Sequence, residues 1–188
     1  MEKILGQIVD VVGAAIKSKH DRLLTPKEFL QLSADEVDRA TRYDRPLAVA
    51  MVSVDGLVMM RKAEGQKLAD AVMSEVTELV IELLRGPDRT GHLGPGELGL
   101  LMPETTLKNA AGVAERLRRS MAASDRGRNG TTLSIGVAGL SARMRDPKQL
   151  LMTACFELRR AQSRGGNSVS VSAAETLQIS VPRSSQVH

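Results

Sequence analysis

The sequence predicts an α/β sandwich: a mixed five-stranded sheet covered by helices, with an extra helix at the N-terminus. Two observations carry this prediction. Apolar residues recur with helical spacing in several segments, and short apolar runs of strand length lie between those segments. After the N-terminal helix, the expected order is helix, strand, helix, strand, strand, helix, strand, helix, strand. That order is typical of a sheet with helices packed against it.

The composition indicates the kind of core and narrows the possible partners. The 188 residues suffice for one domain with short extensions. Hydrophobic residues make up 42% of the chain and aromatic residues only 2%, so the core is expected to be aliphatic. Few aromatic side chains argue against a protein that stacks nucleic-acid bases. The net charge of +4 is spread over helical segments, and we interpret it as solvated helix surface, with no nucleic-acid partner.

The cysteine, the histidines and the hydropathy pattern further narrow the class of protein that the sequence indicates. The single cysteine, Cys155, lies in a helical pattern and is expected to be a small buried residue in a reducing cytoplasm. The three histidines have no Cys or His neighbours at ligand spacing, so no zinc site is expected. No apolar run approaches the roughly 20 residues of a membrane span, and no signal peptide is evident. We therefore expect a soluble, cytoplasmic protein without membrane insertion.

Residues 1–20 are predicted to form an amphipathic interaction helix. Leu5, Val9, Val12 and Ile16 follow one another at steps of four, three and four, which places them on one face. Such a face needs a partner surface. The sequence leaves three possibilities open, namely the domain itself, a second copy in a dimer, and another protein.

The first half of the domain has a clear helix start and a clear buried strand. Thr25-Pro26-Lys27-Glu28 combines a threonine N-cap, a proline in the first turn and a glutamate three residues after the cap, and the helix is expected to reach Tyr43. The continuous apolar run 47–54 predicts a strand covered on both faces. Helical spacing resumes over 66–84, and Arg85-Gly86-Pro87-Asp88 ends that helix.

The second half alternates strands and helices. The expected strands are 90–93, 98–102, 132–138 and 168–172. The first two form a hairpin around the turn Gly94-Pro95-Gly96-Glu97. Helices are expected over 106–122 and from Asp146-Pro147 onward. Residues 173–188 have no periodic pattern and are expected to form a disordered tail.

Seven short segments resemble, in order and spacing, the GGDEF family of diguanylate cyclases, which condense two GTP molecules into cyclic di-GMP. They are Leu24-Thr25, Arg45-Pro46-Leu47, Gly94-Pro95-Gly96-Glu97-Leu98, Leu101-Met102-Pro103-Glu104-Thr105, Val113-Ala114-Glu115-Arg116-Leu117-Arg118, Ser134-Ile135-Gly136-Val137-Ala138 and Gly165-Gly166-Asn167-Ser168-Val169. The resemblance covers residues 21–172. It implies the nucleotidyl-cyclase-like sandwich of that family, with a mostly antiparallel sheet.

The resemblance also implies where a catalytic site would lie. In the family two metal ions, held by carboxylates, neutralise the polyphosphate during attack by a 3′-hydroxyl. The metal-binding aspartate of the family matches Ser53, and the essential acid of the signature turn matches Gly96. In the signature turn, Pro95 follows Gly94 and stands where the family has its second glycine. Glu97 keeps the acidic residue that follows the essential acid in the family. The residues that would hold the metal are therefore missing, and no metal or other cofactor is expected.

Other matched positions agree with this interpretation. The asparagine that reads guanine in the family matches Arg61, while its partner aspartate matches Asp70. The lysine and arginine that neutralise phosphates match Gln162 and Gly166. We predict a catalytically inactive domain in which Asp70 and Glu97 are structural remnants.

A second family site is matched more completely. Arg85 and Asp88 match the R-x-x-D motif of the inhibitory site, which binds cyclic di-GMP, and Arg116 matches a further arginine used there. Guanidinium groups can donate bidentately to guanine O6 and N7, and a carboxylate can accept from guanine N–H groups. A simpler alternative is that the arginine complements the helix dipole and the aspartate belongs to a turn. Both residues are expected at an exposed turn.

The favoured interpretation is a receptor that binds cyclic di-GMP and signals through a protein partner. The alternatives are a ligand-free interaction scaffold and, least supported, a nucleotide enzyme.

Overall fold

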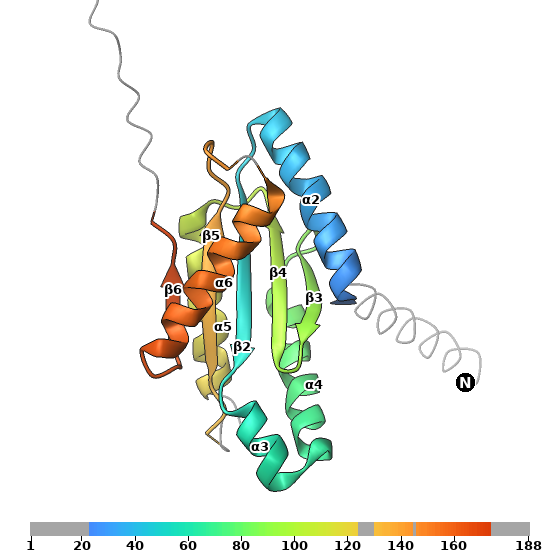
Figure 1. Ribbon diagram of the computed structural model, residues 1–188, viewed down its shortest axis with the longest axis vertical. Coiled ribbons are helices and arrows are strands. Elements are labelled where there is room, and N and C mark those ends of the chain that lie inside the picture. Colours follow the sequence, from blue (N-terminus) through green and yellow to red (C-terminus); the bar gives the residue numbers. More distant parts are fainter. Residues whose placement is uncertain (1–22, 124–129, 145, 174–188) are drawn as a thin grey trace, which may run out of the picture.

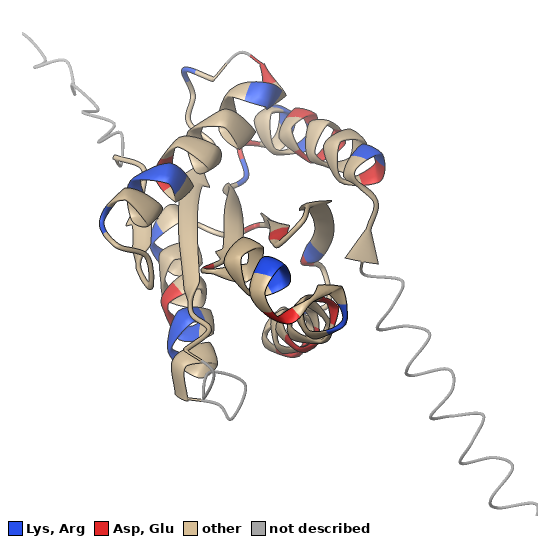
Figure 2. Ribbon diagram, turned by 60° about the horizontal axis from the view of Figure 1, so that its bottom comes forward, with Lys and Arg blue, Asp and Glu red and all other residues tan. Residues whose placement is uncertain are grey.

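The protein folds as a sheet with helices on both faces, as the computed structural model shows (Figures 1 and 2). The structure describes residues 23–123, 130–144 and 146–173. The predicted N-terminal helix over residues 1–20 lies outside the described residues, and so does the predicted tail from residue 174 on.

Within the described residues the sheet has six strands, one more than the sequence predicts. Their spatial order is β1 (Leu23–Leu24), β3 (Arg89–Gly94), β4 (Glu97–Pro103), β2 (Leu47–Val54), β5 (Leu133–Gly139) and β6 (Val169–Val171). The inner pairs are antiparallel, and the two outer pairs, β1 with β3 and β5 with β6, are parallel. The sequence missed β1 because two residues carry no alternation, and this strand exists only through its pairing with β3.

The central strand β2 divides the molecule into two cores. All eight of its residues are buried, as the continuous apolar run predicts. Ala48, Ala50 and Val52 face the core under α4 (Gln66–Leu83) and α5 (Leu107–Ala123). Val49 and Met51 face the opposite core, under α2 (Pro26–Tyr43) and α6 (Pro147–Ser163). Figure 2 shows these two helix layers on either side of the sheet.

Local capping explains where α2 and α6 begin. Thr25 and Glu28 form a reciprocal capping box, with Glu28 Oε2 accepting from the Thr25 backbone N–H at 2.8 Å. Asp146 caps α6 in the same way, through its own side chain and Gln149. Both helices have proline in the first turn. The predicted starts of these helices are confirmed.

One helix was not predicted from the sequence. The eight-residue α3 (Leu57–Glu64) begins after Gly56 and packs against α4, and the two helices project from one end of the sheet (Figure 1). It spans about two turns, too short to show a reliable apolar period. This helix matters for the site, because its first residue, Leu57, is buried against the β3–β4 turn.

Cys155 is exposed on α6, so the prediction of a buried cysteine was wrong. The buried face of α6 carries Leu151, Ala154, Leu158 and Ala161. Cys155 lies one residue beyond this face, at its border. Among the described residues, no helix combines the length and hydropathy that a membrane crossing requires.

Candidate functional site

The first candidate region lies where β2 ends beside the β3–β4 turn. Ser53 is buried near the end of β2 and pairs across the sheet with Glu97. The Gln162 side chain, in the last turn of α6, donates from Nε2 to the Ser53 hydroxyl at 3.1 Å. The structure therefore brings together Ser53, Glu97 and Gln162, which the sequence placed at one site. This polar contact between β2 and α6 is a hydrogen bond between neutral groups.

Gly96 occupies a position where a side chain fits poorly. Its φ is +83°, a left-handed conformation that favours glycine. A Cβ added there would lie 2.8 Å from Leu57 Cδ2. Pro95 and Glu97, on either side, are exposed. Gly96 thus closes the hairpin beneath Leu57, and an acidic side chain at this position would have to displace Leu57.

Asp55 has a structural role that sequence reasoning did not assign. Its carboxylate accepts from Thr132 Oγ1 at 2.7 Å, Ser134 Oγ at 2.6 Å and the Asn167 backbone N–H at 2.9 Å. A Cβ on Gly166 would lie 3.1 Å from the same carboxylate. Asp55 therefore joins the end of β2 to the start of β5 and to the loop before β6. Its oxygens are committed to the protein.

The other matched positions lie on the α3–α4 projection. Asp70 is exposed on α4 and accepts a hydrogen bond from Gln66 Nε2 at 2.6 Å. Arg61 lies on α3 and is partly buried, and its Nε has no hydrogen-bond partner. The two residues therefore occupy different helices of the projection.

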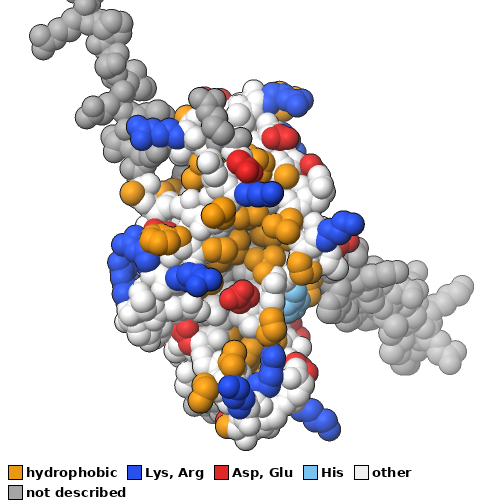
Figure 3. Space-filling model, in the orientation of Figure 1, with side chains coloured by type: hydrophobic (Ala, Val, Ile, Leu, Met, Phe, Trp, Pro, Cys, Tyr) orange, Lys and Arg blue, Asp and Glu red, His pale blue; other side chains and the backbone are white. Residues whose placement is uncertain are grey.

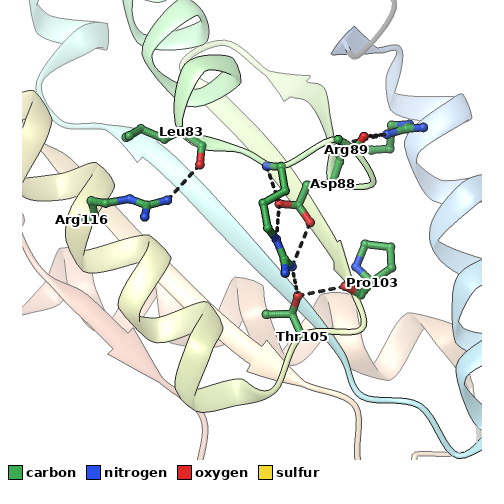
Figure 4. Close-up of polar contacts among 8 residues, drawn as sticks. Leu83, Asp88, Arg89, Pro103, Thr105 and Arg116 are labelled. Carbon is green, nitrogen blue, oxygen red and sulfur yellow. Dashed lines mark hydrogen bonds and ion pairs between the residues drawn. The ribbon is translucent and has the colours of Figure 1, made fainter.

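The second candidate region is the turn that follows α4. Asp88 accepts from the Arg85 backbone N–H at 2.9 Å and from the Arg85 guanidinium at 3.4 and 3.5 Å (Figure 4). The side chain of Asp88 is only 2% exposed, whereas that of Arg85 is 58% exposed. The expectation that both residues are exposed was wrong for Asp88. Its carboxylate folds back to accept from the Arg85 backbone N–H, which lies just beyond the end of α4, and so closes the turn.

Arg116 reaches the same turn from α5. It is exposed and donates from Nη2 to the Leu83 carbonyl at 2.9 Å, satisfying an acceptor at the C-terminus of α4 (Figure 4). The structure thus brings Arg85, Asp88 and Arg116 together at one helix end.

Two further residues complete this turn, and neither was predicted. Arg89 donates to the carbonyls of Gly86 at 2.7 Å and Asp88 at 2.9 Å. Thr105, nearly fully buried, accepts from Arg85 Nη2 and donates to the Pro103 carbonyl at 2.9 Å. Thr105 is twenty residues from Arg85 in the sequence, so no local pattern could indicate the contact. Arg89 directly follows the R-x-x-D motif in the sequence, and this position was a visible signal for its role in the turn.

An ion cluster on α5 stands next to Arg116. Hydrogen bonds from Arg118, and then the contact with Arg119, hold the pKa of Glu115 at about 2 against an ordinary value of 4.5. Arg118 also donates from Nη1 to Asn167 Oδ1 at 2.8 Å. The cluster therefore connects α5 to the loop that holds Asp55.

Comparison with known proteins identifies the family. Residues 23–168 match the family described as diguanylate cyclase, GGDEF domain. This chain belongs to the GGDEF family. The resemblance inferred from the sequence is confirmed, and so is the α/β fold class.

Curated relatives of this GGDEF chain are longer proteins. The response regulator PleD of Caulobacter vibrioides is 28% identical over 139 residues, which are 71% of this chain and 31% of PleD. The bifunctional diguanylate cyclase/cyclic di-GMP phosphodiesterase MucR of Pseudomonas aeruginosa is 28% identical over 153 residues, which are 76% of this chain and 22% of MucR. The chain thus spans at most about a third of these relatives.

Solved GGDEF structures share the fold. The GGDEF domain of DgcB from Caulobacter crescentus, in complex with c-di-GMP, aligns with a TM-score of 0.74 at 19% identity, covering 82% of this chain and 90% of that one. The diguanylate cyclase SiaD of Pseudomonas aeruginosa, in complex with its activator SiaC, aligns with a TM-score of 0.74 at 25% identity, covering 91% and 69%.

The residues of this GGDEF domain do not fit the metal ions that the family's chemistry implies. Hard divalent cations prefer carboxylate ligands. The two matched positions offer a hydroxyl bonded to Gln162 and a glycine, while the Asp55 carboxylate accepts three hydrogen bonds from the protein. Within the described parts of the chain, no group of three or more His, Cys, Asp or Glu side chains could hold a metal.

Proposed function

We propose that this chain is a catalytically inactive GGDEF domain that binds cyclic di-GMP at the turn formed by Arg85, Asp88 and Arg116. Bound ligand would then alter how the domain engages a protein partner. The observation that carries the proposal is the convergence of Arg85 and Arg116 on the end of α4, with the Arg85 side chain 58% exposed.

The geometry of the turn suits a guanine base and its phosphates. The contacts of the Arg85 guanidinium with Asp88, at 3.4 and 3.5 Å, are long for charged hydrogen bonds. A guanine edge can therefore replace them with shorter bidentate contacts to O6 and N7. Arg116 is exposed one helix away and can meet a phosphate. Asp88 keeps the turn closed, and so it positions Arg85 rather than standing free to meet the ligand.

The absence of catalysis is supported by the former active-site edge. Ser53 and Gly96 supply no carboxylate, and Leu57 occupies the space that a side chain at position 96 would need. Gln162 and Gly166 supply no positive charge for a triphosphate. Positioned metal ions and charged donors are the main source of rate in such phosphoryl chemistry.

The relatives support the ligand and the mode of action. The DgcB GGDEF domain was solved with c-di-GMP, which is a ligand of at least one domain of this fold. The SiaD complex shows a GGDEF protein with a bound activator protein. Both comparisons are consistent with a receptor that acts through a protein partner.

Isothermal titration calorimetry with cyclic di-GMP tests the proposal. We expect a Kd on the order of micromolar, about 8 kcal/mol of binding free energy. Arg85→Ala should weaken binding by about 1–3 kcal/mol, as for the loss of a bidentate guanine contact. Arg42→Ala, which removes an exposed arginine from α2, is the matched control and should leave affinity unchanged. No binding heat from the unmodified chain would favour the ligand-free scaffold instead.

A further inference from the structure

An apolar stripe runs along the exposed side of α6. Met152 and Phe156, one turn apart, are 69% and 62% exposed, and Cys155 lies between them on the same side. The chain contains only two phenylalanines and one tyrosine, so an exposed phenylalanine is a substantial part of its aromatic surface. Figure 3 shows hydrophobic side chains gathered in the middle of this face, in the region between α6 and α2 in Figure 1.

A groove of about 390 Å³ adjoins the stripe. Its walls include the apolar side chains of Met51, Leu93 and Leu158, and two charged residues, Glu97 and Arg159, line it as well. The polar side chain of Gln162 also lines the groove, so its surface is mixed, and an amphipathic helix can contact such a surface with its apolar and its polar residues. An apolar patch of this kind on a folded domain usually marks an interaction surface.

The N-terminal segment of the same chain has the complementary pattern. Its apolar row from Leu5 to Ile16 covers twelve residues, about 18 Å if helical. The polar residues from Lys17 to Arg22 follow it and can span up to about 20 Å when extended. The segment therefore offers an apolar face about three helical turns long and a linker that leads to β1.

The described chain begins in a strand next to β3, which contributes Leu93 to the groove. Leu24 in β1 pairs with Gly91 of β3, and Leu93, two residues further along β3, lines the groove. Leu24 and Leu93 both pack on the core beneath α2 and α6. The N-terminal segment is thus joined to the face that carries the groove. A short linker gives an effective concentration in the millimolar range, which favours docking on the same chain over docking on a second copy.

We propose that residues 1–19 form an amphipathic helix that docks its Leu5, Val9, Val12 and Ile16 row onto the α6 stripe and groove of the same chain. The docked helix covers Cys155, Phe156 and the border residue Glu97. This inference is independent of cyclic di-GMP binding, because the groove lies on the opposite helix layer from α4 and α5.

The native Cys155 reports docking directly. We expect maleimide labelling of Cys155 in the full chain to be about tenfold faster in Val12→Asp than in the unmodified protein, equivalent to about 1.4 kcal/mol of docking free energy. Burial, followed by the nearby Glu97 carboxylate, raises the pKa of the Cys155 thiol, so all rates are compared at one fixed pH. Ala14→Asp places the same charge on the opposite side of the predicted helix and should label at the unmodified rate. Equal rates in all three folded proteins would overturn the proposal.

Disulfide trapping distinguishes a groove occupied by the N-terminal segment of the same chain from one occupied by the segment of a second copy. Val9→Cys and Val12→Cys are each oxidised with diamide, which removes two hydrogens from a pair of thiols. Docking on the same chain predicts a monomer with an internal disulfide to Cys155, absent in the Ala14→Cys control. Formation of covalent dimers alone would assign the groove to a second copy and overturn the proposal, and so would the failure of both variants to cross-link.

Discussion

The Gln162 side chain donates a 3.1 Å hydrogen bond to the buried hydroxyl of Ser53, joining the last turn of α6 to the end of β2. Both residues stand at positions that the family resemblance assigns to charged groups. A neutral pair needs no counter-ion and incurs little desolvation penalty when buried. The Ser53–Gln162 contact therefore helps to fix the packing of the helix on the sheet.

The first prediction concerns catalysis. The unmodified protein incubated with GTP and Mg²⁺ should form no cyclic di-GMP, as measured by liquid chromatography with mass detection. The double variant Ser53→Asp, Gly96→Asp should also be inactive, because Gln162 and Gly166 leave the phosphates without positive charge. Product from the unmodified protein would refute the assignment of an inactive domain.

The second prediction separates two reasons why a side chain at Gly96 would destabilise the fold, namely the left-handed backbone and the contact with Leu57. Gly96→Ala should lower the free energy of unfolding by about 2 kcal/mol or more, through its left-handed φ and the close contact with Leu57. Gly56 has a similar φ of +73° but no atom within 4 Å of an added Cβ. Gly56→Ala should therefore cost only about 1 kcal/mol. Urea denaturation gives both values, and equal costs would show that Leu57 moves away freely.

The third prediction distinguishes the two residues of the R-x-x-D turn. Asp88→Ala should lower the free energy of unfolding by about 1–3 kcal/mol, because it removes the acceptor of the Arg85 backbone N–H from a buried position. Arg85→Ala should change the unfolding free energy by less than about 1 kcal/mol, since the Arg85 side chain is mostly exposed. If Asp88→Ala were as stable as the unmodified protein, the turn-closing role would be wrong.

The fourth prediction tests the contact between α6 and β5. A Cβ on Gly136 would lie 2.0 Å from the Leu158 backbone nitrogen and 2.2 Å from the Ala154 carbonyl oxygen. Neither backbone atom can move without shifting the helix, so Gly136→Ala should cost about 3 kcal/mol or more. Gly112, on α5, has open space around it, and Gly112→Ala should stabilise the fold by about 0.5–1 kcal/mol. Thermal and urea unfolding of the two variants measure both effects.

The fifth prediction concerns pH. The lowered pKa of Glu115 means that its ion cluster stabilises the folded state above pH 4.5, and this contribution is lost as the pH falls toward about 2. Because the Glu115 side chain is about a third exposed, we expect only about 1 kcal/mol. Glu115→Gln should lower the free energy of unfolding by this amount at neutral pH and should change it little near pH 2. Arg118→Gln should reproduce the effect of Glu115→Gln more fully than Arg119→Gln does, since Arg118 contributes the largest part of the lowering of the Glu115 pKa.

The elements with strong local signals were predictable. The capping boxes at Thr25 and Asp146 set two helix starts before any tertiary contact is considered, and the continuous apolar run of β2 predicts its burial on both faces. The family segment Gly94-Pro95-Gly96-Glu97-Leu98 predicted the turn between β3 and β4, because residue spacing is preserved within such short motifs. Each of these features depends on neighbours a few residues apart.

Contacts between distant segments decided the rest. β1 exists because Leu23 and Leu24 pair with β3, and the Arg85 side chain is held in part by Thr105, twenty residues away in the sequence. The exposure of Cys155 depends on which face of α6 packs on the sheet. The sequence by itself determined which residues are available for chemistry, and the tertiary structure decided which of them water can reach. Local spacing sets backbone conformation, whereas burial depends on what packs on top from elsewhere in the chain.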